Sequence, residues 1–345
     1  MGPQGHTLID ALVSNGALLV CTAMAIVAIM VAEYWMSPGR RQRTGFGLRP
    51  LADLIKLAGK RSSQASNGGM GGWAPTLLLA ISFTALAVIP FCLVSPNQGH
   101  AWTALAAWGG SASQGVIYVV ALGFVALQVG LFAGERASAG GDQDFGGLRL
   151  VARQLSCYLA LGLALLGVVL VSGASRFNQV LEFQASTLGY LIPSWNLFVQ
   201  PLGFAVCIVA LVQVMPWRPI TQSDPSRGGR LNSLYAGPQL ALIMVAERVH
   251  LIAASALVVT LYLGGGHLPG IDSGSGIPAH VQVTFTAIKT AIVVLGFLWV
   301  RSSLPSLALE RAASFGWKFL LPVAFANLLL VALGSAFLTT PSGSP

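Results

Sequence analysis

A chain of 345 residues is long enough for two soluble domains, but 54% of its residues are hydrophobic and only 9% are charged. This composition excludes a soluble globular enzyme. The formal net charge of +8 does not indicate nucleic-acid binding, because the basic residues lie in short links between apolar segments. The sequence instead predicts one integral membrane domain over residues 1–345, with no nucleic acid among its partners.

Eight segments are apolar and long enough to cross a bilayer, which takes about 20 residues of helix. In chain order they cover residues 11–33, 74–94, 115–134, 154–173, 196–215, 238–263, 283–303 and 317–339. Their backbones must be helical, because lipid cannot satisfy the open edge of a strand. The residues before the first segment carry no Lys or Arg, unlike a cleaved signal peptide, so we expect that segment to be retained. The predicted fold class is an all-α polytopic membrane protein with eight transmembrane helices and an amphipathic cytoplasmic helix after the first.

The links between these segments differ in charge. Sixteen of the 19 lysines and arginines fall in or beside the odd-numbered links, whereas Arg176 is alone in the even-numbered ones. Cytoplasmic links carry the excess of basic residues, so we expect both termini on the periplasmic side. The absence of a transit-like start favours a bacterial inner membrane. The Gly-rich links 62–72 and 264–278 are expected to be flexible connectors with no chemistry of their own.

The first cytoplasmic link contains an amphipathic segment, Gly45–Lys60. Apolar residues recur in it at helical spacing and polar ones lie elsewhere around the turn: Leu51, Leu54, Ile55 and Ala58 against Asp53, Lys56 and Lys60. One interpretation is an anchor helix whose basic residues face lipid head groups. The other is one lip of a portal through which a membrane-dissolved molecule enters. Amphipathicity alone favours the anchor.

Four ionisable residues interrupt the sixth and seventh segments: Glu247, Arg248, His250 and Lys289. A charge at the bilayer centre costs about 2.5 to 3.5 kcal/mol, so we expect these groups to face partners or a polar cavity. Glu247 and His250 share one helix face. A pair between Glu247 and Lys289 across the bundle is one arrangement that fits. Such a pair would either hold two helices together or form part of a proton relay.

No catalytic constellation is evident in the sequence. The four cysteines lie in apolar segments and are expected to pack there. His6, His100, His267 and His280 lie near the termini or in external links and are expected at the surface. Without metal-ligand spacing or a nucleophile motif, the chain is expected to carry no redox centre, metal or flavin of its own.

Four stretches keep the residues of known sequence motifs in order: Gly45–Lys60, Gly147–Leu163, Asn232–Glu247 and Lys289–Asn327. The motifs are G-x-L-Q-P-x-A-D-x-x-K, G-x-x-R-x-x-A-Q-x-x-S-Y-E-x-x-L-G-L, F-N-x-E-Y-S-G to L-A-E-Y, and K-x-x-x-x-x-x-x-F-x-W-V-R-x-x-L-P to G-W-K-x-L-L-P-x-x-x-x-N. The matched residues are Pro50, Ala52, Asp53, Lys56, Arg149, Ala152, Ser156, Gly162, Asn232, Tyr235, Gly237, Ala246, Glu247, Lys289, Trp299, Arg301, Pro305, Gly316, Trp317, Lys318, Pro322 and Asn327. Together the stretches resemble the NADH dehydrogenase subunit 1 family, the H-type membrane subunits of respiratory complex I.

The resemblance implies a protein at the heel of a membrane arm, which docks the peripheral arm and builds the chamber for a lipid-soluble quinone. It implies quinone as the substrate, subunits of both arms as partners, and a part in coupling electron transfer to proton translocation. Residues implied at the quinone portal and chamber are Arg49, Pro50, Asp53, Lys56, Arg149, Asp224 and Tyr235. Those implied along the proton path are Glu247, Arg248, His250 and Lys289, and those implied for docking are Arg301 and Lys318.

The chain departs from the family in its acidic positions. The family's acidic fifth link, P-F-D-L-P-E-x-E-S-E, is replaced by residues 217–226, where Asp224 is the remaining acid. Leu234 and Tyr158 stand where the motifs have Glu. These losses favour an alternative, the membrane anchor of an energy-converting hydrogenase-like or other complex that does not reduce quinone. The intramembrane charges leave a third hypothesis, an independent ion transporter.

Overall fold

The computed structural model describes residues 3–36, 49–60, 73–91, 144–185, 187–188, 192–214, 237–267, 279–303 and 313–339. The helices are α1 (Pro3–Met36), α2 (Arg49–Ala58), α3 (Ala74–Val88), α6 (Asp144–Ser172), α7 (Phe177–Ala185), α8 (Asn196–Val199), α9 (Pro201–Val214), α11 (Pro238–Tyr262), α12 (Ala279–Ser303) and α14 (Leu321–Thr339). A π-helical turn, η4 (Gly316–Leu320), leads into α14. Two short strands, β1 (Thr187–Leu188) and β2 (Ile192–Pro193), form an antiparallel pair.

Seven of the eight predicted transmembrane segments coincide with helices, and the segment 115–134 lies outside the described residues. Within the described residues, four helical stretches are apolar and long enough to cross a membrane: Gln154–Ser172, Pro238–Tyr262, Val281–Ser303 and Ala313–Ala336. Shorter apolar stretches lie at Val20–Met36, Pro75–Val88 and Pro201–Val214. The helical, apolar architecture is therefore confirmed, whereas the number of eight crossings stays a prediction.

Prolines shape the ends of three of these helices. The predicted span 196–215 is not one continuous helix, because it breaks at Gln200 between α8 and α9. The break occurs there because Pro201 has no N–H to continue the helical hydrogen bonds. α3 ends at Val88, six residues before its predicted end, because Ile89 takes the extended backbone that a following Pro90 favours. In η4 the N–H of the residue before Pro322 bonds five residues back, which accommodates the proline ring.

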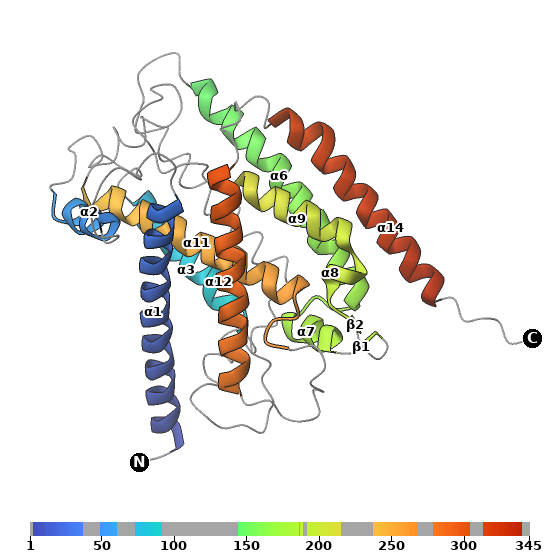
Figure 1. The fold of residues 1–345 in the computed structure, drawn as a ribbon, viewed down its shortest axis with the longest axis horizontal. Helices are drawn as coiled ribbons and strands as arrows, with labels where there is room; N and C mark the ends of the chain where they lie inside the picture. The colour runs from blue at the N-terminus through green and yellow to red at the C-terminus, as the bar shows by residue number, and fades with distance from the viewer. Residues whose placement is uncertain are drawn as a thin grey trace, which may run out of the picture.

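α11 is the centre of the bundle (Figure 1). It runs obliquely through the molecule and packs against α1, α2, α3, α7, α9 and α12. A second group, α6, α9 and α14, lies side by side on the opposite flank from α1. From Arg248 to Tyr262 nearly every side chain of α11 is buried. The core also contains Cys157 and Cys207, as expected, whereas Cys21 of α1 is exposed.

Four exposed tryptophans lie at helix ends that odd-numbered links join. They are Trp35 at the end of α1, Trp73 before α3, Trp299 near the end of α12 and Trp317 in η4. Tryptophan gathers where hydrocarbon meets lipid head groups, because its ring is apolar and its N–H is polar. Their positions therefore agree with one common side for the first and seventh links, whereas the orientation of the whole chain stays a prediction.

Gly316 lies where η4 packs closely on α6, so a substitution there tests this packing. A Cβ atom at this position would collide with Ser156 Oγ and lie 3.1 Å from Ser156 Cβ, whereas Gly334 of α14 has nothing within 4 Å. We expect Gly316→Ala to destabilise the protein by about 1 to 3 kcal/mol through overpacking. The matched change Gly334→Ala should be neutral or slightly stabilising, since Ala is the better helix former. Thermal unfolding in detergent measures both, and equal melting temperatures would contradict the packing described.

Candidate functional site

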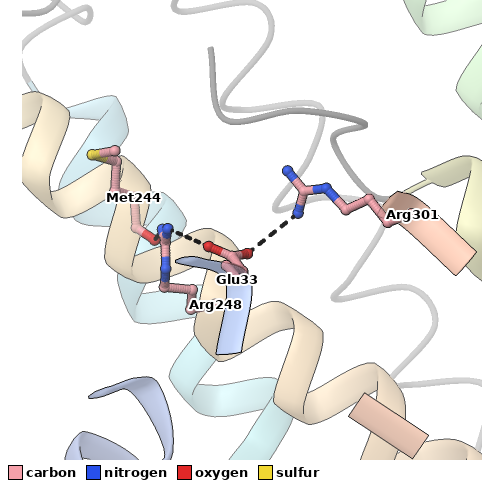
Figure 2. A network of polar contacts seen from close by, with 4 residues as sticks. All are labelled: Glu33, Met244, Arg248 and Arg301. Carbon is pink, nitrogen blue, oxygen red and sulfur yellow. Dashed lines mark hydrogen bonds and ion pairs between the residues drawn. The ribbon is translucent and has the colours of Figure 1, made fainter. Parts of the chain in front are cut away.

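Four charged side chains from three helices form a group that we call the charge cluster: Glu33 of α1, Glu247 and Arg248 of α11, and Arg301 of α12. Arg248 Nη2 donates to Glu33 Oε2 at 2.8 Å, and Arg301 Nη1 lies 3.5 Å from Glu33 Oε1 (Figure 2). Arg248 Nη1 also donates to the backbone oxygen of Met244 at 2.7 Å. One carboxylate therefore joins α1 to both α11 and α12.

The cluster is only partly accessible to solvent. The exposed fraction is 8% for the Arg248 side chain, 21% for Glu33 and 22% for Arg301. Glu247 interacts electrostatically with Arg248, Arg301 and Glu33. The two carboxylates and two guanidinium groups sum to zero net charge when all are ionised, which reduces the cost of placing them in an apolar bundle. Arg248 Nε is buried without a hydrogen-bond partner among the described residues.

Glu33 was not among the residues singled out from the sequence. It is the first acid after a long charge-free stretch and sits in the last turn of α1. A lone acid at the end of an apolar helix, next to strongly basic links, was the signal available. The sequence does not say which cations such an acid meets, because that depends on how three helices are placed.

The expected pair between Glu247 and Lys289 is wrong. Lys289 Nζ instead donates to the backbone oxygens of Leu263, Gly265 and His267, at 2.9, 2.8 and 2.8 Å. Glu247 and Leu263 are 16 residues apart in sequence, which corresponds to about 24 Å along a helix. The two charged groups are consequently far apart along α11, because Glu247 lies near its middle and Lys289 contacts the turn after its C-terminal end.

Two further expectations about the segment after α11 are also corrected. His267 is buried and not a surface residue, because the chain folds back beneath Lys289. Residues 264–267, expected to start a flexible connector, are buried in a packed turn. The rest of that link, 268–278, and the link 62–72 lie outside the described residues.

The predicted portal residues fall on α2, which is the amphipathic helix expected from the sequence. Asp53 and Lys56 are exposed and Pro50 is half-buried, while Leu54 packs against the core. α2 contacts both α1 and α11, the helices that supply three of the four residues of the charge cluster. The helix that carries the predicted portal residues therefore packs on two of the three helices that carry the charge cluster.

The other predicted site residues are placed less completely. Arg49 begins α2 and Arg149 lies in α6, but their side chains are outside the described part, as are Asp224 and Tyr235 altogether. His250 lies one turn after Glu247 on α11 and is half-buried. Of the two predicted docking residues, Arg301 contacts Glu33 and Lys318 is exposed on η4.

The described helices and charges define a multi-pass helical membrane protein whose charged groups are shared between helices. Residues 13–332 match the family described as NADH dehydrogenase. The chain belongs to this family, which confirms the resemblance found in its motifs.

Three bacterial relatives illustrate the similarity. The chain is 31% identical to the H subunit of NADH-quinone oxidoreductase from Deinococcus deserti, over 85% of this chain and 73% of the relative. It is 29% identical to the corresponding H subunit from Salinibacter ruber, over 92% and 94%. It is 28% identical to NADH-quinone oxidoreductase subunit 8 of Rhodothermus marinus, over 95% and 96%.

A double-mutant cycle tests whether Glu33 and Arg248 act as a pair. We expect Glu33→Gln and Arg248→Gln each to destabilise the protein by about 1 to 3 kcal/mol, because each leaves a partly buried charge without its partner. The double variant should cost less than the sum, with a coupling energy of about 0.5 to 3 kcal/mol. Melting temperatures in detergent report the differences, with the exposed Lys56→Gln as control. Strict additivity would mean that the two side chains do not interact.

Proposed function

We propose that this chain is a membrane-arm subunit of an NADH-quinone oxidoreductase complex, working with other membrane-arm and peripheral-arm subunits. Its family membership over residues 13–332 and its relatives, named as subunits of that enzyme, support this assignment. The observation that carries the proposal is the packing of α2, which keeps the matched Pro50, Asp53 and Lys56, against α1 and α11. In this role the chain supplies no redox centre, and electrons reach a lipid-soluble quinone from partner subunits.

The position of α2 favours a portal over a simple anchor. An anchor helix needs only an apolar face against lipid and basic groups toward head groups. α2 instead inserts Leu54 into the protein core while Asp53, Ile55 and Lys56 stay exposed. It thus combines a fixed inner side with an open, mixed polar and apolar outer side, which suits a quinone with a polar head and an isoprenoid tail. Arg49, Arg149, Asp224 and Tyr235 complete the proposed portal and chamber.

The charge cluster is the proposed link between quinone chemistry and proton movement. Reduction of a quinone to a quinol takes up two electrons and two protons, so charge changes near the chamber before the protons arrive. Partly buried carboxylates close to guanidinium groups respond to such changes, because charges interact strongly where water is scarce. We assign Glu247 and His250, one turn apart on α11, to the proton path, with Glu33 and Arg248 setting the local field.

Arg248 distinguishes this chain from the family motif. The motif L-A-E-Y has Tyr after the Glu that matches Glu247, and this chain has Arg there. The added cation pairs with Glu33 at 2.8 Å. Tyr158, in place of another motif Glu, is buried in the hydrophobic core. The proposed proton path therefore has fewer carboxylates and one more fixed cation than the motifs imply.

The proposed topology has eight crossings, including 115–134, with the odd-numbered links in the cytoplasm of a bacterium and both termini in the periplasm. The concentration of Lys and Arg in the odd-numbered links supports it. Arg301 and Lys318 lie in helices at their cytoplasmic ends in this orientation. There the exposed Lys318 is available to the docked peripheral arm, and Arg301, which contacts Glu33, presents to it only the exposed part of its side chain.

The buried Tyr158 favours one alternative, a membrane anchor that keeps the architecture without reducing quinone. Such an anchor would need no portal, and its α2 would tolerate substitution. An independent ion transporter, the other alternative, requires a single protein that is stable and active after purification. The family and the relatives named as subunits oppose that alternative.

Substitutions on α2 test the portal. In the purified complex, we expect Asp53→Asn and Lys56→Gln to raise the KM for a long-chain quinone severalfold and to leave kcat nearly unchanged, because the portal does not touch the reacting head group. A short-chain quinone should be affected less, and Glu182→Gln, an exposed acid of α7, serves as control. Unchanged KM values for the long-chain quinone would favour the anchor.

Glu247→Gln tests the proton path. The change keeps the size of the side chain and removes its exchangeable charge. We expect proton translocation per quinone reduced to fall more than the amount of assembled complex. Proton uptake and quinone reduction are measured together in sealed vesicles, and assembly is measured on native gels. An equal loss of proton uptake, quinone reduction and assembly would identify Glu247 as a structural residue only.

A further inference from the structure

The turn that follows α11 closes around a single ammonium group. Leu263 and Gly265 both donate their N–H groups to Val259 O, at 3.1 and 3.0 Å, which bends the chain back over the helix end. The backbone oxygens of Leu263, Gly265 and His267 then converge on Lys289 Nζ, all within 2.9 Å.

The chemistry of this turn matches a primary ammonium ion. An ammonium has three N–H donors and no acceptor, and here each donor has its own carbonyl. The ring of Trp195 lies 4.5 Å from Lys289 Nζ, so the aromatic face covers a further side of the cation. The carbonyl end of α11 adds the negative pole of the helix dipole. The three carbonyls, the aromatic ring and the helix end each favour a compact positive charge at this point.

Neighbouring elements hold the turn in this shape independently of Lys289. Gln184 of α7 donates to Thr260 O at 3.0 Å and accepts from the N–H of Gly264 at 3.0 Å. Asn196 of α8 donates to Leu261 O at 2.7 Å. Gly264 has φ +69°, and a Cβ there would lie 2.8 Å from Trp195 Cδ1, so only glycine fits. We call the backbone oxygens of Leu263, Gly265 and His267 the carbonyl cage, and α7, α8 and the turn itself hold it in place.

Among the described residues, the hydrogen-bond partners of Lys289 Nζ are three backbone oxygens and no acidic side chain. His267 contributes its backbone oxygen, and its ring Nε2 is buried without a hydrogen-bond partner among the described residues. Burial lowers the pKa of the His267 imidazole, and the neighbouring Lys289 ammonium lowers it further. Loss of a proton from Lys289 would leave one of three carbonyls without a donor, which is unfavourable in a buried site.

We propose that the turn after α11 is a binding site for a primary ammonium group, which the chain fills with Lys289. Lys289 is then a fixed positive charge that positions α12, and not a carrier of protons. Arg301 follows 12 residues later, about 18 Å along the same helix. Arg301 ties that end of α12 to Glu33, so α12 is fastened at both places by cations.

Chemical rescue tests the site. In the intact complex, Lys289→Ala removes the side chain beyond Cβ, a part that n-propylammonium replaces atom for atom. We expect this variant to melt at a lower temperature and millimolar n-propylammonium to restore most of the loss. Tetramethylammonium has the same charge but no N–H, and n-propanol has no charge, so neither should rescue. The exposed Lys60→Ala, with and without n-propylammonium, is the matched control. Failure of n-propylammonium to rescue, or equal rescue by tetramethylammonium, would overturn the assignment.

A second variant separates a fixed charge from a proton carrier. Arg cannot release its proton in proteins, so Lys289→Arg keeps the charge and removes the exchange. In the assembled fraction of this variant, we expect the number of protons translocated per quinone reduced to equal that of the unmodified complex. Assembly with selective loss of translocation would overturn the fixed-charge role. The rescue of the melting temperature does not depend on quinone reduction, so its result is independent of the proposed function.

Discussion

The carboxylate of Glu33 is the interaction on which the arrangement of α1, α11 and α12 depends. An apolar bundle can hold Arg248 and Arg301 only if a counter-charge lies between them, and Glu33 gives one oxygen to each guanidinium group. α1, which is distant in sequence from α11 and α12, is thereby joined to both of them. The positions of α2, which packs on two of these helices, and of the proposed portal follow from it.

α12 is held near its middle and at its C-terminal end by different chemistry, and this difference suits the proposed function. At the C-terminal end Arg301 contacts a carboxylate that is still about one-fifth exposed, a setting in which charge responds to changes nearby. Near the middle of the helix, Lys289 is enclosed by three backbone carbonyls that do not titrate. The contact between Arg301 and Glu33 can take part in coupling, whereas the contacts of Lys289 hold α12 in a fixed position.

Much of the fold was predictable from the sequence, because apolar length and the distribution of Lys and Arg are local properties. The amphipathic α2 was predictable for the same reason, and Pro201 could have indicated the break between α8 and α9. The partners of the buried charges were not predictable. Spacing along one helix shows that Glu247 and His250 share a face, but it does not show that Lys289 lies at the far end of α11. The packed turn at 264–267 looked like a flexible Gly-rich link because its order comes from Gln184, Asn196 and Lys289.

A density map of the assembled complex in a lipid bilayer tests the central claim most directly. We expect the Glu33 carboxylate between the guanidinium groups of Arg248 and Arg301, with α2 packed beside them and protein around all three. A map in which Arg248 points into the acyl chains, or in which Glu33 lies beyond hydrogen-bonding distance of both arginines, would contradict it.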